Sequence, residues 1–484
     1  MMNTMTIQMY DARADSINVD DIATNDNNRL MINRMKRNNP EDHDVLYIQN
    51  QHDEDGEACE DYVPEDTNDM GWLGYFIGKN EHLRQLTFVS FNPISGVSFT
   101  EILEAFIRGV NNNKSITTLD FRMDLLGGRV FTMLVPFFEN SQTLANLTIH
   151  DCHLGDDGWR SLALAIGSSK HKSLENVILE DNNISDEGLV DIITALSIHP
   201  RLENIELHGN RISTNGCTAL STLLRCSATQ LKTLNLDNNE INDEVIDVLV
   251  PAFSSSLHKL FMRDNHPITS RGWQHLASIL EAPNSNLKEL TVVGNNIDDE
   301  TLTAFANALL NNKTLTSLNL NDNQAITEKG WQSLSNLLCD TSSINSTYLS
   351  NHTLHNLGNI SNENPLQSLL ELNRRDDKKD IAMIKILQHH DFDMMPLFEW
   401  EFKVLPLMIN WFERASRIPM PEDYELHIGP RKLSSIYQFV RAVPLLYVET
   451  RLRKELEDIK VLETKYQLAQ ERKRSIMDRL DQRL

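Results

Sequence analysis

Apolar residues recur through the middle of the chain in a phrase that reads Leu-x-x-Leu-x-Leu-x-x-Asn-x-Ile. Its Leu-x-Leu alternation is typical of a β-strand with one buried face. The phrase returns ten times at intervals of 26 to 33 residues, which predicts a stack of repeats that bury their apolar faces against one another. The ten phrases open at Leu83, Ile116, Leu144, Leu174, Leu202, Leu231, Leu257, Leu287, Leu315 and Ile344.

The remainder of each repeat has the spacing of a helix. In the fourth repeat, Leu189, Ile192, Ile193 and Leu196 share one helix face, which is expected to lie against the preceding strand. One strand and one helix in about 29 residues is the signature of leucine-rich repeats. The predicted fold class is therefore α/β, a leucine-rich-repeat horseshoe solenoid with parallel strands inside and helices outside.

Asparagine recurs at the ninth position of the phrase, where the backbone leaves the strand and its amides need partners. Because an amide side chain both donates and accepts, stacked asparagines are expected to form a structural ladder between neighbouring turns. Cys152 takes this position in the third repeat. The ladder residues are Asn182, Asn210, Asn239, Asn265, Asn295 and Asn323.

A longer period is superimposed on the first. The pairs Gly158-Trp159, Gly272-Trp273 and Gly330-Trp331 follow the bend in alternate repeats, so the unit is two repeats. Paired repeats of 28 and 29 residues resemble the ribonuclease-inhibitor-like class, which also includes the Ran GTPase-activating protein. The resemblance covers roughly residues 83–355 and implies a protein-binding solenoid.

Composition divides the chain into four parts. Residues 1–70 are polar and are expected to form a disordered acidic tail, although residues 45–48 could add a strand of an irregular first repeat. The solenoid is expected over 71–355, with a helix around Trp72 and Phe76 as its N-terminal cap. Residues 365–446 are expected to form a helical module. Residues 447–484 predict a charged helix, either a short coiled coil through which the chain self-associates or a solvated helix.

Net charge narrows the classes of partner. The formal net charge is −24, and the segment from Asn38 to Gly78 supplies twelve carboxylates without a Lys or Arg. Such a chain repels phosphate backbones, so no nucleic-acid partner is expected. No apolar window is long enough for a membrane span, and no membrane partner is expected. Five scattered cysteines without a signal peptide predict an intracellular protein of the cytoplasm or nucleus.

Few motifs offer chemistry. Gly74, Gly78 and Lys79 imitate a phosphate loop, but their spacing is one residue short and Asn80 replaces the magnesium-binding hydroxyl. The sequence His389-His390-Asp391-Phe392-Asp393 contains metal-ligand types, but adjacent helical histidines diverge by about 100°. No catalytic residues, metal or cofactor are therefore predicted, and the chain is not expected to be an enzyme.

The third, fifth and seventh positions of each phrase point away from the predicted core and form the concave face of the solenoid. They are mostly polar, which suits a folded protein partner. Among them are Asp120, Arg122, His150, Glu180, Glu206, His208, Asp237 and Glu289.

One strand on this face differs from the others. Lys259, Phe261 and Arg263 place an aromatic ring between two cations, flanked by Asp237 and Glu289 on the adjacent strands. Exposed aromatic and Arg side chains have the composition of binding hot spots, so these five residues are the predicted partner-binding site. The alternative is that Asp237 and Glu289 only neutralise the two cations.

Two functions follow from these patterns. The first is a non-enzymatic scaffold that binds a protein partner, not identified by the sequence, on its concave face. The alternative is a GTPase-activating protein for a small GTPase. It depends on the resemblance to the Ran activator, because no catalytic Arg or Asn of that family matches a position in this chain.

Overall fold

The structure is a computed structural model that describes residues 6–42, 44–49, 61–89, 99–122, 128–226, 230–253, 256–360, 365–390 and 454–475. These residues fall into two compact units. The first holds the described residues of 1–337 and 353–370, and the second holds those of 338–352 and 371–484.

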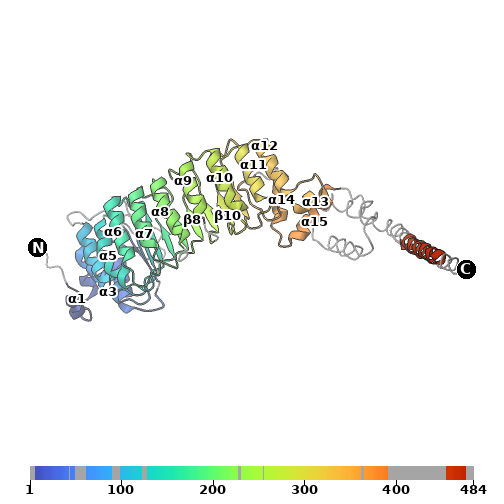
Figure 1. The fold of residues 1–484 in the computed structure, drawn as a ribbon. Helices are drawn as coiled ribbons and strands as arrows, with labels where there is room; N and C mark the ends of the chain where they lie inside the picture. The colour runs from blue at the N-terminus through green and yellow to red at the C-terminus, as the bar shows by residue number, and fades with distance from the viewer. Residues whose placement is uncertain are drawn as a thin grey trace. The chain divides into compact units, whose positions relative to one another are not determined.

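An open parallel sheet of eleven strands forms the inner layer of the first unit (Figure 1). Its order is β11-β10-β9-β8-β7-β6-β5-β4-β3-β1-β2, and consecutive repeats pair at equivalent positions of the phrase. The strands are β1 Val45–Ile48, β2 Asp61–Tyr62, β3 Gln85–Val89, β4 Thr118–Arg122, β5 Asn146–His150, β6 Asn176–Ile178, β7 Asn204–Glu206, β8 Thr233–Asn235, β9 Lys259–Phe261, β10 Glu289–Thr291 and β11 Ser317–Asn319.

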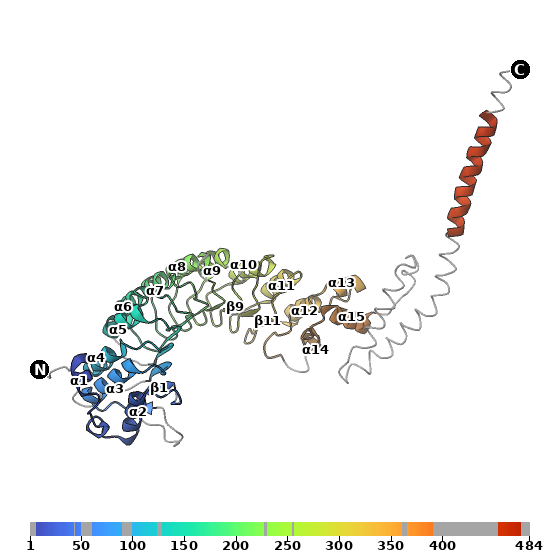
Figure 2. The same cartoon turned by 90° about the horizontal axis from the view of Figure 1, so that it is seen from below.

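Helices of the repeats cover the outer side of this curved sheet (Figure 2). The α/β leucine-rich-repeat solenoid predicted from the sequence is confirmed. The repeat helices are α3 Thr67–Lys79, α4 Phe99–Val110, α5 Gly128–Asn140, α6 Gly155–Gly167, α7 Asp186–Leu196, α8 Thr214–Arg225, α9 Asp243–Leu249 with the 3-10 turn η2 Val250–Ala252, α10 Ser270–Glu281, α11 Asp299–Leu309 and α12 Glu328–Leu338.

Strand alternation separates the core from the concave face. In β5, Leu147 and Ile149 are fully buried, whereas Asn146, Thr148 and His150 remain partly exposed. Three of the repeat helices begin where a polar side chain caps free amides: Ser185, Asn242 and Asp298 accept hydrogen bonds from the first turns of α7, α9 and α11.

Contacts between neighbouring repeats also show the two-repeat unit. Asp186 accepts hydrogen bonds from the backbone N–H and the hydroxyl of Ser213, at 2.9 and 2.7 Å. Asp243 does the same for Thr269, and Asp299 does so for Thr327. The acceptors lie 57 and 56 residues apart, so the fourth, sixth and eighth repeats each hold the following repeat by the same contact.

The prediction of a disordered tail is wrong for the described residues between 6 and 70. Helices α1 Ile7–Arg13 and α2 Asp26–Arg37, the 3-10 turn η1 Val19–Asp21 and the strands β1 and β2 all lie there. Polar residues that suggested disorder form the cap instead. Buried Asn28 bonds both the N–H and the carbonyl of Val63, and Glu65 accepts from Thr24 and Asn25.

The predicted strand at β1 is confirmed, because it pairs in parallel with β3. The helix predicted around Trp72 and Phe76 is α3. Residues 50–60, which contain part of the acidic segment, lie outside the described residues.

The prediction of a tenth repeat opening at Ile344 is wrong. Residues Ile344–Leu349 form helix α13, begun by a cap at Ser343, and the expected core residues Ile344 and Leu349 are exposed. The solenoid instead continues at Leu354, which is fully buried, and Asn356 forms a parallel bridge with Ser317 of β11. The concave positions predicted at 346, 348 and 350 therefore do not belong to the sheet.

The second unit includes α13 and α15 Lys378–His389, and α14 Pro365–Asn373 ends in it. Lys385 of α15 is fully buried and donates to the carbonyl of Leu338 and to Asn373 Oδ1, at 2.6 and 2.8 Å. Residues 454–475 form a further helix, and every residue of it is exposed. Within the helical module predicted over 365–446, residues 391–446 lie outside the described residues.

Candidate functional site: the concave face

A row of side chains crosses the concave face at the seventh position of the phrase. It is defined here as the position-seven row: Arg122, His150, Glu180, His208, Asp237 and Arg263. The parallel register of β4 to β9 places these residues side by side, because each strand contributes the same phrase position. At about 4.8 Å per strand the row is roughly 24 Å long. Cations form its two ends and carboxylates lie between them.

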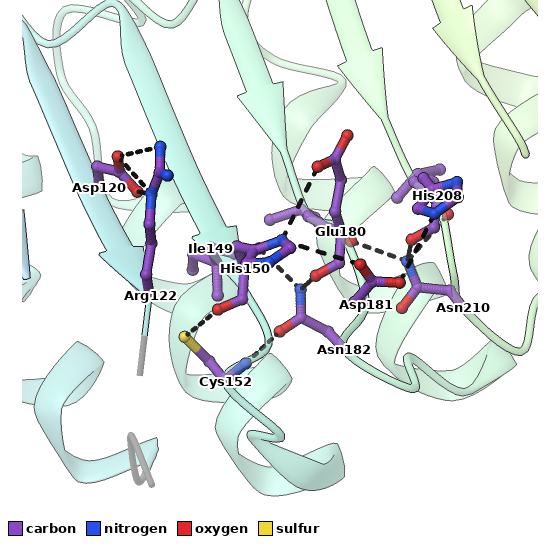
Figure 3. Close-up of polar contacts among 12 residues, drawn as sticks. Asp120, Arg122, Ile149, His150, Cys152, Glu180, Asp181, Asn182, His208 and Asn210 are labelled. Atoms are coloured by element: carbon purple, nitrogen blue, oxygen red, sulfur yellow. Dashed lines mark hydrogen bonds and ion pairs between the residues drawn. The ribbon is translucent and has the colours of Figure 1, made fainter. Parts of the chain in front are cut away.

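Arg122 forms one end of the row in a close pair with Asp120, which lies two residues earlier on β4. The guanidinium Nε donates to both carboxylate oxygens at 3.1 and 3.0 Å (Figure 3). The Asp120 side chain is 6% exposed, whereas that of Arg122 is 56% exposed. The hydrogen bond that Arg122 donates to the Asp120 carboxylate raises the pKa of Arg122. The pair therefore fixes a permanent cation at this edge of the concave face.

At the centre of the row, His150, Glu180 and His208 lie close to a further carboxylate, that of Asp181 (Figure 3). His150 Nδ1 lies 3.9 Å from Glu180 and 4.0 Å from Asp181, and His208 Nε2 lies 3.8 Å from Asp181. These separations exceed hydrogen-bond length, so these contacts leave hydrogen-bonding capacity on the four side chains. All four are partly exposed.

Negative charge is concentrated beside the histidines. Burial and a hydrogen bond with Glu206 raise the pKa of Glu180. Burial also raises the pKa of Asp237, although the Arg263 backbone amide donates to that carboxylate at 2.6 Å. A carboxylate whose pKa is raised gains free energy from an approaching cation, because the cation favours the ionised form.

The predicted hot spot lies further along the same face. Lys259 and Phe261 are on β9, with Glu289 opposite Lys259 on β10. Lys259 Nζ forms an ion pair with Glu289 at 3.1 Å. Arg263 Nε instead pairs with Asp264 at 3.3 Å, and Asp237 contacts its backbone N–H rather than its guanidinium. The five predicted residues are thus neighbours, and both cations are half-exposed.

The structure adds residues that the sequence did not single out as a site. Glu180, Asp181, His150, His208 and Glu206 all lie in or beside the position-seven row. The sequence could have indicated these residues, because four of them occupy phrase positions whose side chains point away from the core. Asp181 occupies the bend, where a left-handed φ of 55° turns its carboxylate toward both histidines.

Behind this face, the predicted ladder asparagines are buried and bonded across repeats. The Cys152 N–H donates to Asn182 Oδ1 at 2.8 Å, and Asn182 Nδ2 donates to the carbonyls of Ile149 and Glu180 (Figure 3). Equivalent contacts occur at Asn210, Asn239, Asn295 and Asn323.

Asn265 differs from the other ladder residues. Its Nδ2 donates to the carbonyls of Leu236 and Arg263 at 3.0 Å, but its buried Oδ1 has no hydrogen-bond partner within the described residues. This residue follows the 26-residue repeat, which is the shortest interval of the series.

A second set of amides lines the face itself, at the third phrase position. Asn204 donates to Asn176, Asn176 donates to Asn146 at 2.6 Å, and Asn146 donates to Thr118 at 3.0 Å. These bonds fix a second row of side chains on the same face, four residues before the position-seven row in each repeat. The face is therefore preorganised rather than a loose polar surface.

The glycines that imitate a phosphate loop have a packing role. Gly74 and Gly78 lie within α3, and a Cβ on either would overlap the backbone of α4 at Phe106 or Gly109. They let the two helices approach closely. His390, from the suspected metal cluster, contacts the Thr347 hydroxyl at 2.7 Å, while Asp391 and Asp393 lie outside the described residues.

Among the residues that the structure describes, no group of three or more His, Cys, Asp or Glu side chains is arranged to hold a metal ion. None of the described helices has both the length and the apolar character needed to cross a bilayer.

Comparison with known proteins gives matches within the solenoid. A family profile described as "Leucine Rich repeat" matches residues 170–192, 284–306 and 311–335. The mouse (Mus musculus) protein "NACHT, LRR and PYD domains-containing protein 4C" is 30% identical over 202 residues, which are 41% of this chain and 20% of that protein. Its relative numbered 14, also from mouse, is 25% identical over 233 residues, covering 48% and 20% respectively.

The chain thus spans about a fifth of the length of these two curated relatives. A solved structure, described as "Crystal structure of Rad7 and Elc1 complex in yeast", is 15% identical, with a TM-score of 0.27 over 55% of this chain and 75% of that one. The family profile, the two relatives and the strand–helix architecture all indicate leucine-rich repeats. The chain is a leucine-rich repeat protein.

Proposed function

We propose that this protein is an interaction scaffold that binds a partner protein on its concave face. The observation that supports this most directly is the position-seven row, whose charged and histidine side chains lie on the open side of the sheet. The fold needs few of these groups for its own packing. A preorganised polar face of this kind favours recognition of another folded surface.

Charge suggests the chemistry of that partner. Glu180, Asp181, Glu206 and Asp237 bring four carboxylates to the middle of the face, and only the ends of the row carry arginines. Burial raises the pKa of both Glu180 and Asp237, so a cation that approaches either carboxylate would favour its ionised form. A partner that inserts Lys or Arg side chains here would complement this charge and also satisfy the free hydrogen-bonding capacity.

A paired set of charge reversals tests the proposal. Glu180→Lys combined with Glu206→Lys changes the concave face, and Glu187→Lys combined with Glu244→Lys makes the same net change at exposed first-turn positions of α7 and α9. The full-length chain and both variants are used to capture proteins from extracts of the producing cell, with quantitative mass spectrometry.

The expected result is a protein retained by the wild type and the helix variant but lost by the concave variant, and its purified form should then bind directly in a calorimetric titration. Equal capture by all three chains, or loss with the helix variant instead, contradicts concave-face binding.

The alternative of a GTPase-activating protein rests only on the resemblance. Phosphate release from GTP-loaded small GTPases, measured with and without the full chain, tests it. We expect no acceleration; a faster release would replace the scaffold role with an enzymatic one.

A further inference from the structure

The helix formed by residues 454–475 carries exposed apolar side chains. Leu456, Ile459, Leu462 and Tyr466 are between 52% and 67% exposed. Large apolar side chains at helical spacing on an open surface mark a contact face.

These residues follow a heptad pattern. Ile459, Leu462, Tyr466 and Ala469 are separated by three, four and three residues, so they form one stripe along the helix, defined here as the seam. Val461 and Leu468 are equally apolar and equally exposed, but they lie off this stripe. The chain therefore offers both a candidate interface and an internal control for it.

A helix of this length gains little stability from its sequence alone. Helix nucleation is costly, and most of the stability of a protein helix comes from packing its apolar face. The seam supplies such a face along about 15 Å of helix, at 1.5 Å per residue. Pairing with a second helix that carries the same seam would bury the seams of both helices.

The charges beside the seam discriminate between the two orientations of a helix pair. In a parallel pair, Asp458 faces Glu463 of the second copy, and this repulsive contact occurs twice. In an antiparallel pair with Leu462 opposite Tyr466, Asp458 faces Arg472 of the second copy, and this attractive contact occurs twice. Near the centre of this antiparallel pair, Glu463 faces Glu463 of the second copy and Lys465 faces Lys465, and each of these repulsive contacts occurs once. The antiparallel pair is therefore modest in strength, but it is the favoured orientation.

We propose that two copies of this protein associate through residues 454–475 as an antiparallel helix pair, with the seam buried and Asp458 opposite Arg472. This inference is independent of what binds the concave face. It assigns the exposed helix to self-association, leaving the solenoid free to engage a partner.

Sedimentation velocity of the full-length protein over a range of concentrations tests the seam. A dimer should appear as concentration rises. Leu462→Asp should weaken the dimer at least about tenfold, because a charge would be buried in the seam, whereas the neighbouring Val461→Asp should leave it nearly unchanged. A monomer at all concentrations, or equal effects of the two substitutions, overturns the proposal. Thermal unfolding of both variants confirms that the solenoid is intact.

Charge substitutions test the orientation. Asp458→Arg should weaken the antiparallel dimer by several-fold, because it would face Arg472, and adding Arg472→Glu should restore association. A parallel pair gives the opposite sign, since Arg at position 458 would face Glu463 and strengthen the dimer. Strengthening by Asp458→Arg, or no rescue in the double variant, overturns the antiparallel assignment.

Discussion

Asp186 holds Ser213 of the next repeat by two hydrogen bonds, one from the backbone N–H at 2.9 Å and one from the hydroxyl at 2.7 Å. The Asp186 carboxylate therefore caps the entry to α8 although it lies at the start of α7. Gly216 lies against the same carboxylate, and a Cβ there would crowd its Oδ1. One acidic side chain thus links two turns of the solenoid.

Removing this carboxylate should destabilise the solenoid. Asp186→Ala is expected to lower the free energy of unfolding by about 1–3 kcal/mol, because both groups of Ser213 lose their acceptor. Urea denaturation followed by circular dichroism measures the change. Glu187→Ala removes the adjacent exposed carboxylate and serves as the control, which should shift the midpoint little. Similar losses from both variants would show that only helix charge matters.

The ladder should be sensitive to what replaces its amide. Asn210→Ala deprives the Ile184 N–H and the carbonyls of Leu179 and Leu207 of their partner, which should cost on the order of 3 kcal/mol. Asn210→Cys should cost less, since a thiol keeps a weak donor, as Cys152 does toward the carbonyl of Phe121 at 3.4 Å. Chemical denaturation gives both values. Equal losses would mean that the thiol makes no useful contact.

The predicted hot spot can be truncated without disturbing the fold. Replacing Phe261 and Arg263 with Ala keeps the backbone N–H that donates to Asp237. Affinity for the captured partner should fall by at least about 2 kcal/mol, or roughly thirtyfold, if these side chains anchor it. Arg201→Ala, in the exposed loop between α7 and β7, is the matched control. Unchanged affinity of the double variant would remove this patch from the interface.

Lys385 gives the second unit a defined pH dependence. Burial lowers the pKa of the Lys385 ammonium to about 7. This holds although the ammonium donates to several carbonyl oxygens and lies 3.1 Å from His352 Nδ1. The unfolded lysine keeps its ordinary pKa, so the unfolded state binds more protons between pH 7 and about 10.5. Stability of this unit should therefore be lowest below pH 7 and rise as the pH increases through that range.

The free energy of unfolding of this unit should rise by no more than about 1.4 kcal/mol per pH unit. Calorimetric unfolding of the wild type and of Lys385→Met between pH 7.5 and pH 9.5 (roughly the middle of that range) measures it. The difference between the two proteins isolates Lys385 from Cys339, whose pKa burial also raises. Parallel stability curves for the two proteins would show that the lysine does not titrate in this range.

Local periodicity explains why most of the solenoid was predictable. Leu147 and Ile149 alternate with polar neighbours, and Leu189 with Ile192 follows a helix period, so each repeat encodes its own strand and helix. Because identical units stack only in register, parallel pairing followed from the same pattern.

Sequence alone failed where the stabilising contacts are distant along the chain. Asn28 looked like part of a polar tail, but its side chain bonds Val63, which lies 35 residues away, and this closes the exposed end of the sheet. The segment at Ile344 has the sequence of a repeat, yet it forms helix α13, and it is Asn356 that pairs with Ser317 of β11. A short apolar phrase does not specify whether it forms a strand or a helix when an insertion interrupts the period.

The strand–helix unit, its parallel stacking and the outward direction of the polar side chains all follow from sequence periods of two and 3.6 residues. Which of the outward side chains contact one another depends on the folded chain. It brought Asp181 between His150 and His208, paired Lys259 with Glu289, and directed Arg263 to Asp264 rather than Asp237. The physical reason is that such contacts depend on rotamers and bend geometry between residues about 30 positions apart, which no local pattern records.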